Sequence, residues 1–287
     1  MFRQELRHSD EPDARDAVLL ASGPPRVSVV IPTLNEARNL PHVAARLTGV
    51  DEIVVVDGHS TDDTVSVAAQ VWPHARIVRQ TRKGKGNALA CGFAVATGDI
   101  IVMLDADGSA DPAEIPAYVA ALTGGADFAK GSRFCLGGGS SDITRWRWLG
   151  NRVLNGIVNL LYGTRYTDLC YGYNAFWAYC LPTLGLKPGE RGTDMDWGDG
   201  FEVETLINVR IAEAGLTVTE VPSFERERIH GVSKLNAVAD GLRVLRTIAR
   251  ERWRRPARPA AVVADTTADA TERDRPADPP LSRREAA

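Results

Sequence analysis

Short runs of valine and isoleucine, separated by helical patterns, constrain the fold of this 287-residue chain more than any other feature. Apolar runs of this length suit strands buried on both faces. Their alternation with helices is typical of a mostly parallel sheet that helices cover on both sides. The expected strands are 27–32, 52–57, 75–79, 99–104 and 127–131, and the expected helices are 36–47, 62–71, 86–97 and 112–122. The sequence therefore predicts an α/β fold.

The regular alternation ends near residue 131. The elements expected after it are a Gly/Ser-rich loop at 136–141, a helix at 146–162, an aromatic segment at 171–179, a Gly/Asp-rich loop at 189–200, a helix at 201–214, a strand at 216–221 and a basic helix at 233–253. We expect one domain over 26–255. The ends, 1–25 and 256–287, are expected to be disordered, because their composition buries too little apolar surface to offset chain entropy.

Composition and charge exclude several classes of protein. A net charge of -3, from 34 basic and 37 acidic residues, argues against general binding to nucleic acid. No apolar run approaches the ~18–20 residues that span a bilayer, and the start of the chain does not resemble a signal peptide. The four cysteines form no C-x-x-C pair. We therefore expect a cytoplasmic protein with reduced thiols.

Two aspartates directly follow the apolar run at 100–104. Asp105 and Asp107 form a D-x-D motif, and ligands bind at the carboxyl ends of the strands in sheets of this kind. Paired carboxylates offer hard oxygen ligands for Mg2+ or Mn2+, which substrate phosphates complete. Such a cation acts as a Lewis acid on a leaving diphosphate. A solvated aspartate turn is the alternative interpretation.

The stretch Lys83-Gly84-Lys85-Gly86 precedes an expected helix. Glycines let backbone N–H groups approach a phosphate, and a helix N-terminus attracts negative charge. A turn that merely starts the helix remains an equally open interpretation. The stretch lacks the spacing of a P-loop, and no G-x-G-x-x-G follows the first expected strand. The sequence thus disfavours both of those nucleotide-binding folds.

Four blocks together resemble the family 2 glycosyltransferases, which have the GT-A fold. They are VVIPTLNE at 29–36, VVDGHSTD at 55–62, GKG at 84–86 and DAD at 105–107, in the family's order and spacing. The segments GSR at 131–133 and GVSKL at 231–235 resemble the branch of dolichyl-phosphate mannosyltransferases and polyprenyl-phosphate sugar synthases. This resemblance implies a single GT-A domain, with a nucleotide-sugar half at 26–131 and an acceptor half at 132–255.

The resemblance also implies roles for individual residues. The residues implied to bind the nucleotide sugar are Pro32, Thr33, Asn35, Glu36, Asp57, Lys85, Asp105, Ala106 and Asp107. Of these, Asp57 would contact the base, and Asp105 and Asp107 would hold the metal. The acceptor phosphate would be bound by Arg133, Arg147, Arg228 and Lys234. The chain departs from the branch at Gly58, Ser109 and Asn151, where an acid, a glutamine and a serine are common.

The implied activity is metal-assisted transfer of a hexose, with inversion, from a UDP- or GDP-linked sugar to a polyprenyl phosphate. An ionised phosphate needs no base, whereas a hydroxyl acceptor such as a natural product or a glycan needs a carboxylate within reach. The candidates for such a base are Asp194, Asp196, Asp199 and Glu202. Capping of the helix that follows is the alternative role for these acids.

Other functions are weighed against this one. A nucleotidyltransferase should carry a Gly-rich loop after the first strand, and PTLNE at 32–36 is not one. A non-catalytic module that binds nucleotide sugars is disfavoured by the intact D-x-D. The segment RWRW at 145–148 and the basic helix at 233–253 suggest peripheral contact with the inner face of a membrane, although such a helix can also pack on the domain with a solvated basic face.

Overall fold

The computed structural model describes residues 23–192, 194–231 and 237–254, without side-chain surroundings for 237–240. Residues 1–22 and 255–287 lie outside it, so the disorder expected at the two ends stays a prediction. Lys234, an expected acceptor ligand, also lies outside the described residues. The described residues belong to one compact unit.

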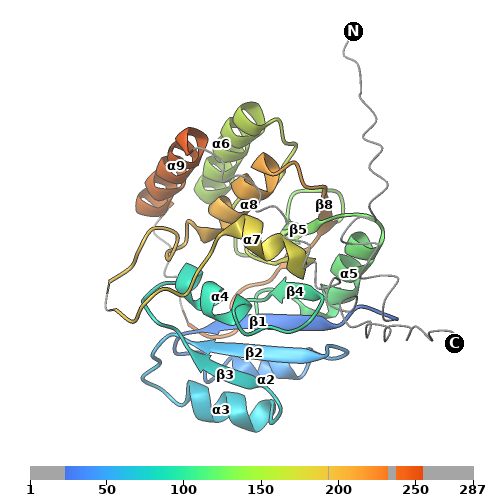
Figure 1. Ribbon diagram of the computed structural model, residues 1–287, viewed down its shortest axis with the longest axis vertical. Helices are drawn as coiled ribbons and strands as arrows, with labels where there is room; N and C mark the ends of the chain where they lie inside the picture. Colours follow the sequence, from blue (N-terminus) through green and yellow to red (C-terminus); the bar gives the residue numbers. More distant parts are fainter. Residues whose placement is uncertain (1–22, 193, 232–236, 255–287) are drawn as a thin grey trace, which may run out of the picture. The chain divides into compact units, whose positions relative to one another are not determined.

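A mixed sheet of seven strands forms the centre of the described chain (Figure 1). Its strand order is β3-β2-β1-β4-β7-β5-β8, and β7 alone runs antiparallel to both of its neighbours. The strands are β1 (Val27–Thr33), β2 (Glu52–Asp57), β3 (Arg76–Arg79), β4 (Ile100–Met103), β5 (Phe128–Ser132), β7 (Asn174–Trp177) and β8 (Val218–Pro222). The short strands β6 (Gly139–Ser140) and β9 (Phe224–Glu225) pair separately. The expected α/β fold with a mostly parallel sheet is confirmed.

The helices fall near the expected positions, with shorter bounds in the first half. They are α2 (Leu40–Ala44), α3 (Thr64–Val71), α4 (Lys85–Phe93), α5 (Ile115–Thr123), α6 (Arg145–Tyr162), α7 (Leu181–Leu184), α8 (Val203–Glu213) and α9 (Ala237–Trp253). Helix α4 packs on β1, β2 and β3, whereas α5 packs on β5, β7 and β8.

The central strands are buried on both faces. All four positions of β4 are buried, as are six of the seven positions of β1. On one face, a Cβ built on Gly92 of α4 would lie 2.3 Å from Val30 Cγ1, so the helix backbone rests directly on the strand. Val29 and Ile31, which point to the other face, are fully buried too. Successive strand residues alternate between faces, so the unbroken apolar runs fit a sheet covered on both sides.

Strand β7 is the strand of the central sheet that the sequence did not predict. It lies within the expected aromatic segment and inserts between β4 and β5. Phe176 of β7 packs edge-on against Phe93 at 5.5 Å and is stacked on Phe128 at 5.8 Å. With both faces buried, a strand of four residues shows no alternation of polar and apolar side chains. Its position therefore depends on partners from α4 and β5.

Helices α6 and α9 lie side by side against α8 (Figure 1). They share a small second core that includes Val158, Val209 and Ile248. A buried ion pair fixes α9 to α8, since Arg210 Nε lies 2.9 Å from Glu251 Oε2. No helix in the described part of the chain is long and apolar enough to cross a membrane.

Candidate active site

The carboxyl ends of β1 and β2 bring two of the predicted blocks together. The strands are parallel, and Thr33 pairs in register with Asp57. Asp57 is buried and accepts hydrogen bonds from the backbone N–H groups of His59 (3.2 Å) and Ser60 (3.1 Å). Asp57 therefore shapes its own turn at the edge of the sheet where the resemblance places the nucleotide.

The loop after β1 is tied to the loop after β2. Asn35 has a φ of 60°, a left-handed conformation that asparagine tolerates better than most residues. Its backbone N–H donates to Ser60 Oγ (2.9 Å), and its Oδ1 accepts from the N–H of Thr61 (2.8 Å). The N–H of Glu36 donates to Thr64 Oγ1 (2.8 Å). These contacts make one rigid edge from the two loops.

A cavity of about 650 Å3 has both aspartates of the D-x-D, which follows β4, in its wall. We call the charged residues of its wall the charged end, namely Lys85, Asp105, Asp107, Arg133, Asp142, Arg147, Glu204, Glu225 and Arg228. We call the apolar residues that α6 and α9 add to the wall the apolar passage, namely Trp146, Leu149, Val153, Leu154, Ile157, Leu242, Val244 and Leu245. The first loops of the nucleotide-sugar half, at 32–36 and 57, do not line this space within the described residues. The cavity thus joins an ionic site to an apolar passage.

Each aspartate of the D-x-D faces a cation of the chain. Lys85 Nζ lies 2.7 Å from Asp105 Oδ1, and Arg228 Nη2 lies 3.1 Å from Asp107 Oδ2. Asp107 is buried, and its Oδ1 also accepts from the N–H of Ser109 at 2.9 Å. Asp105 is more open, with 36% of its side chain exposed. Asp105 is therefore the carboxylate better placed to meet an incoming ligand.

Glu204 joins this group, although the sequence analysis did not single it out. Its Oε1 lies 2.7 Å from Lys85 Nζ, and its side chain is buried. Burial raises the pKa of Glu204, and the nearby ammonium of Lys85 opposes that rise. Burial would lower the pKa of Lys85, but Asp105 and Glu204 outweigh it and raise that pKa. Both partners of the lysine therefore favour its charged form.

Asp194, Asp196, Asp199 and Glu202, the four expected base candidates, do not line the cavity. Asp199 holds Arg82 through two oxygens, at 2.7 Å from Nε and 3.0 Å from Nη2. Glu202 Oε1 accepts from the N–H groups of Gly198 (3.1 Å) and Gly200 (3.3 Å). Both acids therefore support the loop before α8. Residues two apart on a helix point ~200° apart, which separates Glu202 from Glu204.

The glycines of the predicted anion loop serve close packing. The N–H of Gly86 donates to the carbonyl oxygen of Asp199 at 2.7 Å. A Cβ on Gly86 would lie 1.8 Å from the carbonyl oxygen of Gly198. The sequence left two interpretations open for this stretch, a phosphate-binding loop and a turn that starts the helix. The contacts fit the second, with the turn packed against the loop at 198–199. The N–H of Gly86 is then not available to a phosphate.

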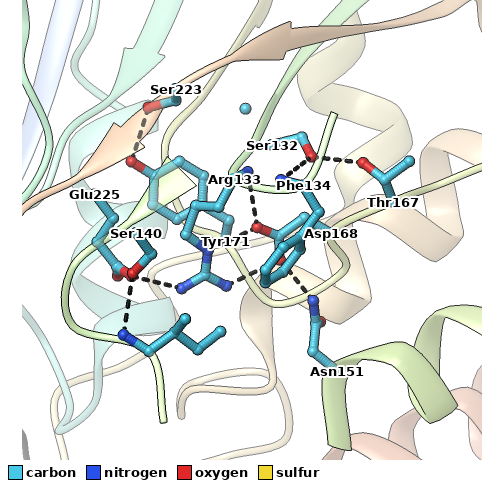
Figure 2. A network of polar contacts seen from close by, with 12 residues as sticks. Ser132, Arg133, Phe134, Ser140, Asn151, Thr167, Asp168, Tyr171, Ser223 and Glu225 are labelled. Carbon is cyan, nitrogen blue, oxygen red and sulfur yellow. Dashed lines mark hydrogen bonds and ion pairs between the residues drawn. The ribbon is translucent and has the colours of Figure 1, made fainter. Parts of the chain in front are cut away.

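Arg133 lies at the centre of a dense polar network (Figure 2). Its Nε and Nη2 donate to the two oxygens of Asp168 at 2.7 and 2.9 Å, and its Nη1 donates to Glu225 at 2.9 Å. The guanidinium also lies over the ring of Tyr171, 4.8 Å from the centroid. Burial would lower the pKa of Arg133, but the two carboxylates outweigh it and raise that pKa. Three of its five N–H bonds are committed, which leaves two for a ligand.

The other two arginines of the expected acceptor site also line the cavity. Arg147, near the start of α6, has its Nη1 3.1 Å from Asp142 Oδ2. Both side chains of this pair are partly exposed. Arg147, Arg228 and Arg133 therefore converge on one space, as the resemblance implies, and each is ion-paired there. Their role in binding an acceptor stays a prediction.

Comparison with known proteins decides the family. Residues 28–179 match the family described as glycosyl transferase family 2. The chain belongs to this family. An uncharacterized glycosyltransferase of Mycobacterium tuberculosis is 34% identical over 223 residues, which cover 75% of this chain and 92% of that protein. A polyprenol monophosphomannose synthase of Mycolicibacterium smegmatis is 31% identical, over 74% of this chain and 81% of that one.

A solved structure agrees with the fold of this family 2 glycosyltransferase. Glucosyl-3-phosphoglycerate synthase from Mycobacterium tuberculosis, in complex with Mn2+, UDP and glucosyl-3-phosphoglycerate, aligns with a TM-score of 0.61 at 25% identity. The alignment covers 83% of this chain and 82% of that one. The predicted GT-A fold, the family and the resemblance to the polyprenyl-phosphate branch are thus confirmed. The chain is an enzyme that transfers a glycosyl group.

Proposed function

We propose that this glycosyltransferase moves a hexose from a UDP- or GDP-linked sugar to a polyprenyl phosphate. The observation that carries the proposal is the lining of the cavity, which combines the charged end with the apolar passage along α6 and α9. A polyprenyl phosphate has the same division, with an anionic head and a hydrocarbon tail. The similarity to a polyprenol monophosphomannose synthase supports the same acceptor class.

The residues of the charged end fit a divalent cation that the donor completes. Asp105 and Asp107 supply hard oxygen ligands at the cavity wall. Within the described residues no group of three or more His, Cys, Asp or Glu side chains could hold a metal alone. Phosphate oxygens of the donor would therefore have to complete the site. When bound, Mg2+ or Mn2+ would neutralise negative charge that develops on the leaving diphosphate.

The side chains of this enzyme supply orientation and charge. Lys85 and Arg228 lie beside the D-x-D, where their positive charges favour the diphosphate as it leaves. Arg133 and Arg147 would hold the acceptor phosphate. Its anionic oxygen attacks the anomeric carbon on the face opposite the diphosphate. The bond from that carbon to the acceptor oxygen forms as the bond to the diphosphate oxygen breaks, with inversion and without a base.

A hydroxyl acceptor is the second candidate, because the arginines of the cavity are already ion-paired and a neutral acceptor would not have to displace their partners. Arg133, Arg147 and Arg228 each face a carboxylate already, so an anionic acceptor must compete with those carboxylates. The cavity wall also includes Asp142 and Glu225, either of which could accept a proton from a hydroxyl group. A soluble acceptor of this kind would leave the apolar passage unused.

Acceptor assays distinguish the two candidates. With UDP- and GDP-hexoses and Mn2+, transfer to undecaprenyl phosphate is expected to exceed transfer to undecaprenol at least a hundredfold, because the neutral alcohol lacks the charge that the arginines would bind and needs a base to attack. Radiolabelled sugar in the lipid extract measures both rates. Equal rates, or transfer only to glycans and small hydroxyl compounds, would contradict the phosphate acceptor and support the second candidate.

We also propose that α6 and α9 place the enzyme at the surface of an anionic membrane. Trp146 and Leu160 of α6 are more than 80% exposed, as is Trp253 at the end of α9. Arginines flank them, including Arg145 and Arg252. Exposed aromatic and apolar side chains with basic neighbours favour a lipid interface.

Vesicle flotation tests this placement. The double variant Trp146→Ser/Trp253→Ser is expected to lower binding to vesicles that contain anionic lipid about tenfold or more, since two indole rings no longer enter the interface. Leu136→Ser is the matched control, because Leu136 is 98% exposed but lies in the loop before β6. A similar loss in the control, or no loss in the double variant, would contradict a membrane-facing surface on α6 and α9.

A further inference from the structure

Lys85, Asp105 and Glu204 form a three-charge cluster in the wall of the cavity. The ammonium of Lys85 lies 2.7 Å from a carboxylate oxygen on each side. The two carboxylates differ in their surroundings, because 36% of the Asp105 side chain is exposed but only 6% of Glu204. Asp105 can therefore turn to a ligand in the cavity, whereas Glu204 is held in the protein.

The position of Glu204 suits a carboxylate that stays in place. It is the second residue of α8, where the free N–H groups and the dipole of the helix stabilise negative charge. A lysine has a long flexible stem and takes its direction from the groups that its ammonium meets. If Asp105 turned to a ligand, Glu204, whose Oε1 lies 2.7 Å from Lys85 Nζ in the structure, would be the carboxylate left beside the ammonium.

Gly172 supplies a separate observation on the same cluster. A Cβ at this position would lie 2.8 Å from Lys85 Nζ and 3.0 Å from Glu204 Oε1. The backbone of the loop before β7 thus closes over the lysine–glutamate pair, and a side chain would intrude on it. Gly172 also lines the cavity. The backbone at Gly172 therefore leaves room for the ion pair between Lys85 and Glu204 but not for a side chain.

We infer that Glu204 is the positioning residue for Lys85: it keeps the ammonium at the charged end of the cavity when donor and cation engage Asp105. The inference rests on the proposed function, since it takes the diphosphate of a nucleotide sugar as the group that Lys85 meets. In this role Glu204 acts through Lys85 rather than on the sugar or the diphosphate. Its effect on donor binding passes through Lys85.

A double-mutant cycle on nucleotide affinity tests this relation. Calorimetry with UDP and GDP, each with Mn2+, measures binding to the wild type, Lys85→Met, Glu204→Gln and the double variant. We expect each single variant to weaken binding roughly ten- to a hundredfold, the range for a charge-assisted hydrogen bond. The double variant should bind as weakly as Lys85→Met and no more weakly. The inference would be overturned if the double variant lost affinity by the product of the two single losses, or if Glu204→Gln bound nucleotide like the wild type.

Two further variants separate positioning from a merely structural role. Glu213→Gln, on the last turn of the same helix and exposed, is the matched control and should bind nucleotide like the wild type. Gly172→Ala should weaken nucleotide binding about tenfold with little change in Tm, because the displaced atoms are the flexible ends of two side chains. This variant carries the test if Glu204→Gln does not fold. A folded Gly172→Ala with wild-type affinity would overturn the inference.

The readout keeps this inference separate from the proposed acceptor. Nucleotide binding needs no acceptor, so an enzyme that binds UDP or GDP but glycosylates no polyprenyl phosphate would contradict the acceptor proposal alone. Multiplicative losses in an enzyme that does glycosylate the lipid would contradict the role of Glu204 alone. Failure of the wild type to bind either nucleotide would contradict the donor class on which both rest.

Discussion

Replacement of Asp107 by asparagine is expected to lower kcat/KM for glycosyl transfer on the order of a thousandfold. Asp107 is buried at the cavity wall, with one oxygen 3.1 Å from the guanidinium of Arg228. Its other oxygen accepts from the N–H of Ser109, a contact that an amide oxygen can keep. The substitution therefore removes a negative charge from the site while it retains the turn after β4.

Initial rates with the preferred nucleotide sugar, measured over a range of Mn2+ concentrations, check this expectation. The variant should need more Mn2+ for half-maximal rate, because one carboxylate ligand is lost. Asp63→Asn is the control, since Asp63 is exposed and its side chain makes no capping hydrogen bond at α3. Wild-type rates in Asp107→Asn at low Mn2+ would exclude the D-x-D as the centre of the reaction.

The sequence predicted the D-x-D site because all of its signals are local. Asp105 and Asp107 follow a buried strand, and the strand pairs with β1 in the expected parallel sense. The carboxyl ends of β1, β2 and β4 then had to meet at one edge of the sheet. Those steps need only the apolar runs and their order along the chain.

The partners of the charged groups could not be predicted in the same way. Lys85 meets Glu204 from α8, more than a hundred residues away, and the sequence offered several acids on that stretch. Only the rotation of α8 decides that Glu204 faces the cavity while Glu202 bonds to the loop. That rotation depends on the tertiary packing of the helix, which no local pattern encodes.

The partners of Arg133, an expected acceptor residue, could not be predicted from the sequence either. The resemblance implies an acceptor role for Arg133, and the structure places it in the cavity wall, but its partners Asp168 and Glu225 come from a loop and from β9. A basic residue in a motif gives no sign that two distant carboxylates already hold it. An acceptor phosphate that bound Arg133 would have to share this guanidinium with both carboxylates.

Replacement of Asp168 by asparagine is expected to destabilise the fold by about 3–5 kcal/mol, because it leaves the buried charge of Arg133 without its main partner. Asp168 is fully buried and accepts from both the Nε and the Nη2 of Arg133, and from Asn151 Nδ2 at 3.0 Å. For a domain of this size the loss corresponds to a fall in Tm of roughly 6–20 °C. Thermal unfolding at pH 7 measures it.

Asp142→Asn is the matched control for stability. Asp142 also pairs with an arginine, Arg147, but both side chains are partly exposed. Water screens such a pair, so its loss should cost less than about 1 kcal/mol. Equal falls in Tm for the two variants would show that burial does not distinguish the pairs, and would contradict a central structural role for the contact between Arg133 and Asp168.

The dependence on pH gives a second test of the same pair. Burial alone would raise the pKa of Asp168, but the hydrogen bonds and charge of Arg133 outweigh it and lower that pKa. A lowered pKa means that the carboxylate stabilises the fold fully above its unfolded value of about 4, and that this contribution is lost as the pH falls through the folded value. The gap in unfolding free energy between wild type and Asp168→Asn should therefore stay constant from pH 7 to pH 5 and narrow below about pH 4. A gap that instead narrows as the pH rises would mean that Asp168 is protonated in the folded protein, and that Arg133 is held by Glu225 alone.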